Sequence, residues 1–173
     1  MTVAGEGERR ATELLPEHSG ATRLVAYMAA AWAFVFAAMS FYWAAGGTAG
    51  ASTLGETITR AGREREPLFV AILWGTGALK AIAGVGPLAL ARPWGGRIPR
   101  WISLVATWSA GVLFALYGGA NLAVRGLMAA GAIETPASMH STAARWHLLL
   151  WDPWWLLGGV LFIVAAWQAG RRS

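Results

Sequence analysis

The stretch Leu68–Ala91, LFVAILWGTGALKAIAGVGPLALA, decides the fold of this chain. It is apolar throughout except for a single charged residue, Lys80. A helix of about 20 apolar residues rises about 30 Å, which matches the hydrocarbon core of a bilayer. Inside that core each backbone N–H and C=O must be paired within the segment. The stretch therefore predicts a transmembrane helix.

Three more apolar stretches flank this one along the chain. With it they predict four transmembrane helices, at residues 24–45, 68–91, 101–122 and 147–168. Short alternating segments that would indicate a β-barrel are not found. The sequence therefore predicts an all-α integral membrane four-helix bundle in residues 23–170. The polar residues 1–22 are predicted to form a flexible cytoplasmic tail rather than a signal peptide, because the apolar run that follows is too long.

The start of the fourth helix has two interpretations. Asp152 followed by Pro153 can be an N-cap with proline at the first helical position, which leaves about 17 residues to span the membrane. Alternatively the helix begins near Ser141 or Ala143 and is kinked at Pro153. We favour the kinked helix, because about 17 residues lie at the short limit for a span.

The arginines predict the orientation. The side that carries the tail has eight, and the other side has five: Arg9, Arg10, Arg23, Arg92, Arg97, Arg100, Arg171 and Arg172 against Arg60, Arg63, Arg65, Arg125 and Arg145. Basic residues are more frequent on the cytoplasmic side of membrane proteins. We therefore predict a multi-pass protein of the cell membrane with N- and C-termini in the cytoplasm.

Composition excludes several classes of function. The chain has no cysteine, and His18, His140 and His147 are too scattered for a metal motif, so we predict neither a metal nor a cofactor. The net charge of +5 does not predict nucleic-acid binding, because the basic residues flank the apolar segments instead of forming a patch. The expected partners are membrane lipids, and the oligomeric state is not predicted.

Lys80 is the strongest candidate for a functional residue. It is the only lysine of the chain, and it lies about 12 residues, or roughly 18 Å, from either end of its predicted helix. A charge at that depth costs about 3 kcal/mol or more, so it normally faces the protein interior and has a partner. Lys80 is either a proton carrier or ligand counter-ion, or a paired lysine that only fixes helix packing.

The segment around Asp152 is the second candidate. Asp152 is the only aspartate, and in a kinked helix it shares a face with Arg145, seven residues earlier. It would then lie about 10 to 15 Å below the outer surface, within reach of Lys80. We predict a Lys80–Asp152 interaction, direct or through water. His147 is interpreted first as an interfacial histidine and second as a site residue.

Other polar and aromatic residues gather in the outer half of the predicted bundle. The third helix has a stripe at helical spacing that we expect to face inward, formed by Thr107, Gly111, Phe114, Tyr117, Gly118 and Asn121. Tyr42 and Trp43 precede a glycine-rich exit from the first helix. We predict a cavity that opens outward, with Lys80 as its floor and a rim of Tyr42, Trp43, Tyr117, Asn121, Arg145, His147 and Asp152.

Two stretches resemble a known family of small bacterial membrane proteins. They are Phe41–Gly50, FYWAAGGTAG, followed by Thr53–Gly55, and Arg145–Gly159 with its Trp-His and Trp-Asp-Pro-Trp groups. The chain resembles the family catalogued as domain of unknown function 3995, in particular its actinobacterial members. The resemblance covers nearly the whole chain beyond the tail, and it implies the membrane architecture without an activity. Many relatives have a histidine just before the Tyr-Trp pair, where this chain has Ser40 and Phe41.

Three functions are compatible with these features. The first is binding of a small amphiphilic ligand, or passage of a ligand or protons, at the outward-facing intramembrane site. The second is an enzyme acting on an isoprenoid or quinone-like lipid, with Asp152 as the acid and aromatic rings that stabilise cations. The third is an accessory or structural membrane subunit, in which Lys80 and Asp152 only fix packing.

Overall fold

The computed structural model describes the backbone of residues 4–136 and 141–171, and the side chains of residues 20, 22–136 and 141–171. Along this part of the chain the helices and helical turns are, in order, α1 (Ala4–Ala44), η1 (Ala51–Leu54), α2 (Glu56–Arg63), α3 (Pro67–Ala91), η2 (Pro93–Arg97), α4 (Arg100–Ala129), α5 (Thr142–Trp146), η4 (His147–Trp151) and α6 (Asp152–Gly170). Arg9, Arg10, His18, His140 and Arg172 lie outside the described side chains.

Four helical segments are long and apolar enough to cross a membrane. They are Thr22–Ala44, Pro67–Ala91, Arg100–Ala129 and Thr142–Gly170. The predicted all-helical fold with four such segments is confirmed. The described backbone of residues 4–22, which we predicted to be a flexible tail, is helical and continuous with α1.

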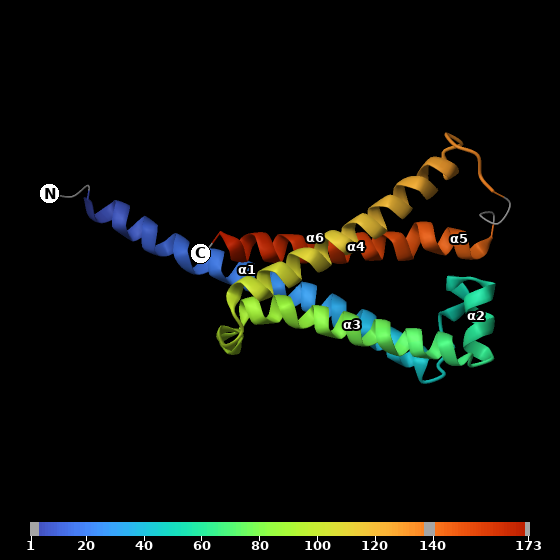
Figure 1. Cartoon of the computed structure of the whole chain (residues 1–173). Coiled ribbons are helices and arrows are strands. Elements are labelled where there is room, and N and C mark those ends of the chain that lie inside the picture. The colour runs from blue at the N-terminus through green and yellow to red at the C-terminus, as the bar shows by residue number, and fades with distance from the viewer. Residues whose placement is uncertain (1–3, 137–140, 172–173) are drawn as a thin grey trace.

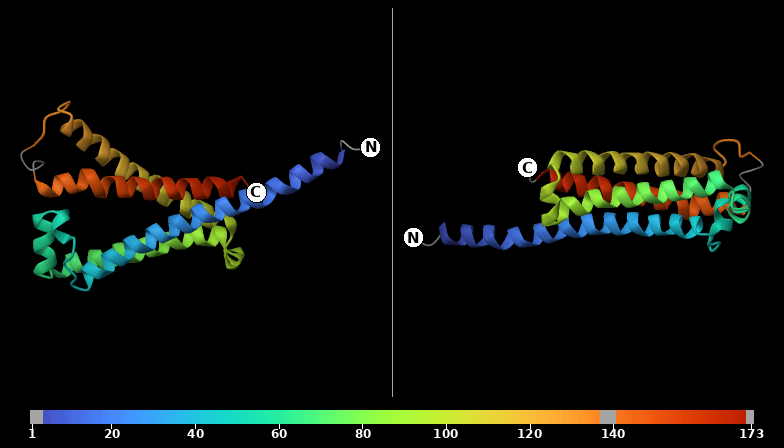
Figure 2. Two further views of the ribbon diagram at one scale, coloured as in Figure 1. Left: turned by 180° about the vertical axis from the view of Figure 1, so that it is seen from behind. Right: turned by 60° about the horizontal axis from the view of Figure 1, so that its bottom comes forward.

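The four long helices form two pairs. Helix α1 packs along α3, and α4 packs along α6, while α1 and α6 make the main contact between the pairs. Figures 1 and 2 show that the pairs lie close together at the end where the chain leaves α6 and diverge toward the end that carries α2 and α5. The space between the pairs is therefore widest near α2 and α5.

Small residues hold α4 and α6 together. A Cβ on Gly118 of α4 would collide with the backbone of Leu156, and a Cβ on Gly159 of α6 would collide with the backbone of Ala115. The two backbones therefore approach as closely as membrane helices with glycine at the contact do. The predicted inward stripe is confirmed for Thr107, Gly111, Phe114 and Gly118, which are all buried.

Aromatic side chains fill the contact between the two pairs. The ring of Trp32 in α1 touches the rings of Phe36, Phe114 and Phe162 at centroid distances of 5.3, 5.3 and 6.2 Å. Its Nε1 donates a hydrogen bond to the carbonyl oxygen of Trp154 at 3.1 Å. Because these residues come from α1, α4 and α6, the cluster joins the pairs.

The fourth long segment begins at Thr142, so the interpretation of Asp152 as an N-cap is wrong. Asp152 has helical dihedral angles, φ −68° and ψ −44°, and the helix continues through it. The chain makes a π-helical turn at His147–Trp151, in which the backbone N–H of Asp152 bonds to the carbonyl oxygen of His147. Pro153 lacks an N–H and so interrupts the regular α-helical ladder at this point.

Candidate functional site

Lys80 lies in the middle of α3 and is half-buried. Its Nζ donates a hydrogen bond to Ser40 Oγ at 2.8 Å, and it lies 3.8 Å from the centroid of the Phe36 ring and 5.5 Å from that of Trp155. No carboxylate of the described residues lies within ion-pair distance of it. Hydroxyl and ring contacts thus replace a counter-ion in this part of the chain.

Ser40 holds the lysine in place from α1. It is 1% exposed, and its Oγ also donates to the carbonyl oxygen of Phe36 at 3.4 Å. Phe36 and Ser40 are four residues apart, so they lie on one face of α1 and meet the same ammonium group. The pair positions the amine without neutralising it.

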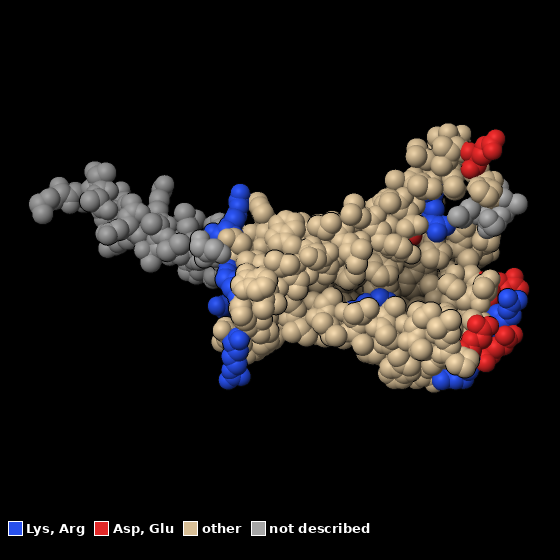
Figure 3. All heavy atoms as spheres, in the orientation of Figure 1, with Lys and Arg blue, Asp and Glu red and all other residues tan. Residues whose placement is uncertain are grey.

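The molecular surface is hollowed between the two helix pairs. Figure 3 shows the surface hollowed between the α1/α3 pair and the α4/α6 pair, with basic side-chain atoms inside the hollow. Tyr117 of α4 is 50% exposed, and its ring packs against Trp155 with a centroid distance of 5.0 Å. Since Trp155 also faces Lys80, these aromatic faces and the amine lie next to one another.

Asp152 belongs to a separate cluster. It is 1% exposed, and its Oδ2 lies 2.9 Å from Nε of Arg125 in α4, while its Oδ1 lies 3.8 Å from Nδ1 of His147. The predicted direct pair of Lys80 with Asp152 is therefore wrong, and a contact through water stays a prediction. Trp151 and Trp155 occupy the face of this helix toward Phe36, so the carboxylate points toward α4.

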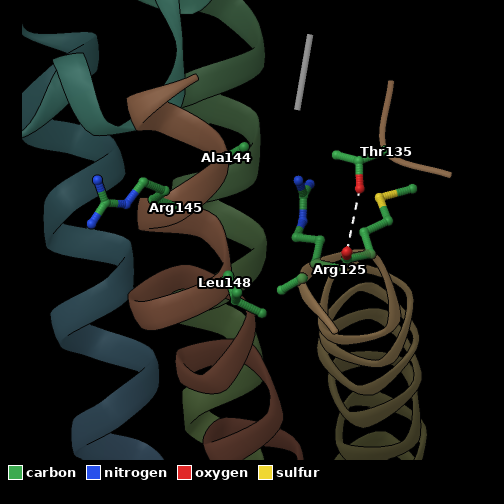
Figure 4. A pocket seen from close by; sticks show the side chains of 7 residues that line it. Arg125, Thr135, Ala144, Arg145 and Leu148 are labelled. Carbon is green, nitrogen blue, oxygen red and sulfur yellow. Dashed lines mark hydrogen bonds between the residues drawn. The ribbon is translucent and has the colours of Figure 1, made fainter. Parts of the chain in front are cut away.

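A cavity of about 340 Å³ lies above this cluster, between the end of α4 and α5. Its lining is Arg125, Met128, Ala129, Thr135, Ala144, Arg145 and Leu148. Figure 4 shows the guanidinium of Arg145 pointing away from Arg125, on the other side of its helix. Arg145 thus contributes to the cavity wall, and the arginine that neutralises Asp152 is Arg125.

Tyr42, Trp43 and Asn121 have local partners. Trp43 Nε1 donates to the carbonyl oxygen of Ala49 at 2.9 Å, and the hydroxyl of Tyr42 accepts from the N–H of Ala49 at 3.2 Å. Asn121 Nδ2 donates to the carbonyl oxygen of Tyr117 at 2.8 Å, within its own helix. These contacts shape the glycine-rich exit of α1 and one turn of α4, away from the amine of Lys80.

Residues 17–162 match a family described as a protein of unknown function, DUF3995. The chain belongs to this family. The resemblance of the Phe41–Gly50 and Arg145–Gly159 stretches is thereby confirmed. No curated protein and no solved structure matches this DUF3995 chain, so its site has to be interpreted from its own residues.

Sequence reasoning missed four side chains of these clusters in this DUF3995 protein, namely Ser40, Phe36, Trp155 and Arg125. A signal for Arg125 was present, because it continues the α4 stripe at four residues beyond Asn121 and seven beyond Gly118. Among the described residues, no group of three or more His, Cys, Asp or Glu is placed to hold a metal ion. The chemistry that this site offers is therefore a hydrogen-bond-donating amine among aromatic rings, beside a neutralised carboxylate.

Proposed function

We propose that this protein is a multi-pass protein of the cell membrane, with both termini in the cytoplasm, that binds a small amphiphile at Lys80. The observation that carries the proposal is the set of partners of Lys80, a hydroxyl and two aromatic rings, with no carboxylate among the described residues. A ligand with an anionic or hydrogen-bond-accepting head group supplies the missing partner.

The depth of Lys80 in the membrane makes its charge costly. A charged side chain at the centre of a membrane helix costs about 3 kcal/mol or more. A cation–π contact returns about 1 to 2 kcal/mol where the cation is desolvated, and a hydrogen bond to a charged group about 1.5 to 3 kcal/mol. An anionic head group that reaches Nζ adds a charge-assisted hydrogen bond in a medium of low dielectric constant, where it is strongest.

The hollow in the molecular surface favours a ligand with an apolar body. It lies between the two helix pairs, and in a membrane its mouth faces the lipid. The half-exposed ring of Tyr117 packs on Trp155, whose own ring centroid lies 5.5 Å from Nζ of Lys80. A flat or chain-like apolar body packs well against such faces, and it enters directly from the bilayer.

Binding is favoured over passage of protons because the other half of the protein lacks a polar route. The core there consists of Trp32, Phe162 and alanines. The buried hydroxyl of Thr107 donates to the carbonyl oxygen of Ser103 at 2.7 Å, inside its own helix. A proton that reached Lys80 would therefore find no chain of described polar groups leading onward.

The lipid enzyme with Asp152 as its acid receives less support. The carboxyl group of Asp152 is 1% exposed and lies 2.9 Å from Nε of Arg125, so a lipid substrate has no open approach to it. A purely structural subunit also receives less support, because the helices are not packed tightly throughout. The surface is hollowed between the helix pairs, and a cavity lies beside Arg125.

The unique lysine allows a direct test. Phenyl isothiocyanate, which is apolar and reacts with amines, should modify Lys80 in proteoliposomes, and mass spectrometry distinguishes this adduct from that of the N-terminal amine. Oleate should slow the modification of Lys80 saturably, whereas methyl oleate, which has the same chain without the charge, should protect weakly. The N-terminal amine is the internal control, because its reactivity should not change. Equal protection by both lipids, or a Lys80 that oleate never protects, contradicts the proposal.

A further inference from the structure

The end of the molecule opposite α2 holds a second cavity, of about 300 Å³. Three arginines from different elements line it, Arg23 of α1, Arg92 at the end of α3 and Arg100 at the start of α4. Figure 3 shows basic side chains gathered at this end and acidic side chains, among those described, only at the other. The cavity is therefore strongly positive over the part of the chain that the structure describes.

An aromatic ring and a backbone carbonyl hold two of the arginines in place. The guanidinium carbon of Arg92 lies 5.3 Å from the centroid of the Tyr27 ring. No described carboxylate lies within ion-pair distance of Arg92 or of Arg23, which is exposed. Arg100 is anchored from below, because one of its terminal nitrogens donates to the carbonyl oxygen of Ala169 at 2.5 Å.

Apart from Thr22, the rest of the lining is apolar. Ala26, Leu90, Ala91, Ala165 and Ala169 face the cavity from α1, α3 and α6. A molecule that enters from the arginine side thus meets a wall of methyl groups beyond the charges. This order, charge first and hydrocarbon second, is that of a phospholipid whose head group lies at the ends of the helices.

The position along the helices agrees with the level of lipid phosphates. Arg23 stands one residue after the start of the segment Thr22–Ala44, and Arg100 begins the segment Arg100–Ala129. Exposed indoles mark the same end of the molecule, namely Trp94, Trp101 and Trp167. Tryptophans concentrate where the hydrocarbon core meets the head groups, so the arginines lie at the depth of the phosphates.

We propose that this cavity binds the phosphate group of an anionic phospholipid. Guanidinium groups bind phosphate oxygens through paired hydrogen bonds, and arginines from three elements can surround one phosphate. Basic pockets between membrane helices are suited to anionic head groups. The site lies at the end of the helices, apart from Lys80 in the middle of α3, so either proposal can fail without the other.

Native mass spectrometry of the full chain in detergent tests this site. Phosphatidylglycerol should bind saturably, and the variant Arg23→Gln/Arg92→Gln should weaken its binding at least about tenfold, because the variant removes two charge-assisted contacts to the phosphate. The matched control is Arg60→Gln/Arg63→Gln, which removes the same charge from α2 and should change the affinity less than twofold. Arg23→Lys/Arg92→Lys keeps the charge and should restore part of the affinity.

Three results would overturn the proposal. The first is equal binding of phosphatidylcholine, which has a phosphate but no net charge. The second is an equal loss of affinity in the control variant, which would indicate attraction by net charge alone. The third is competition by millimolar inorganic phosphate together with no lipid adduct, which would make free phosphate the ligand. Size-exclusion chromatography shows that each variant stays folded before its affinity is measured.

Discussion

The two charges that lie deepest in the long helices, Lys80 and Asp152, have opposite surroundings. Asp152 is fully buried, with Arg125 at 2.9 Å and His147 at 3.8 Å. Lys80 is half-buried, and its partners are a hydroxyl and two rings. A compensated charge that no solvent reaches belongs to the packing of the helices. A half-buried charge without a counter-ion among the described residues is available to a ligand.

The helix pairs explain why the two residues differ. Gly118 brings α4 against the backbone of α6, so that Asp152 meets an arginine across a close contact. Lys80 lies on α3, which packs along α1 but diverges from α4 on the way to α2 (Figure 1). Close packing fixes ion pairs, and divergence leaves room for a ligand.

The largest effect expected concerns Arg125. Arg125→Met should lower the free energy of unfolding by about 3 kcal/mol, because it leaves the carboxylate of Asp152 buried without its partner. Unfolding followed by tryptophan fluorescence in mixed micelles measures the change. Arg145→Met, which alters the wall of the same cavity, is the control and should have an effect below about 0.5 kcal/mol. If the double variant Arg125→Met/Asp152→Leu does not recover most of the loss, the ion pair is not its cause.

Lys80 should respond in the opposite direction. Lys80→Met removes an uncompensated charge from the middle of α3, so the free energy of unfolding should stay level or rise by up to about 2 kcal/mol. The same unfolding assay applies, and Lys80→Arg serves as the variant that keeps the charge. If Lys80→Met lowers the free energy of unfolding by more than about 1 kcal/mol, Lys80 is a packing residue like Asp152, and the two charges do not differ in role.

A smaller effect should separate Ser40 from an ordinary buried serine. Ser40→Ala should cost about 1 kcal/mol, since it removes the only hydroxyl that the described part of the chain offers to Lys80. In the background of Lys80→Met this cost should disappear, which a double-mutant cycle measures. Ser109→Ala, at an exposed position of α4, is the reference for loss of a hydroxyl alone. Costs that simply add would show that Ser40 acts independently of Lys80.

The smallest effect expected is that of His147. Its Nδ1 lies 3.8 Å from Asp152, and its side chain is 24% exposed, so the attraction is weak and screened. His147→Gln should therefore change the free energy of unfolding by less than about 0.5 kcal/mol. An effect as large as that of Arg125→Met would show that the histidine, rather than the arginine, neutralises the carboxylate.

The sequence alone predicted the helices well because length and hydropathy act locally. The four apolar segments lie where they were expected, and the depth of Lys80 followed from counting residues along α3. The end of α4 was placed too early, at residue 122, whereas the helix runs to Ala129. In the sequence, Arg125 resembles an arginine at a membrane surface. In the structure it lies inside α4, where its side chain contacts Asp152.

The partners of the buried charges could not be predicted in the same way. Pairing depends on how each helix is rotated about its own axis, and Gly118, Trp151 and Trp155 set that rotation for α6 through contacts between distant segments. Ser40 gave no signal as a partner, since a single serine in an apolar helix normally bonds its own backbone. The direct neighbour predicted for Lys80, Asp152, was thus wrong, and the role of Lys80 in a site stays a prediction.

The π-helical turn at His147–Trp151 also separates the last long segment into two registers. A five-residue turn holds one residue more than the α-helix needs, and each residue of an α-helix turns the chain by about 100°. An insertion or deletion of one residue in α5 or η4 can thus be absorbed as a change between α and π geometry, while Asp152 and the rest of α6 keep their facing. The turn thus lets the chain before Asp152 change in length without disturbing the contact of α6 with α4.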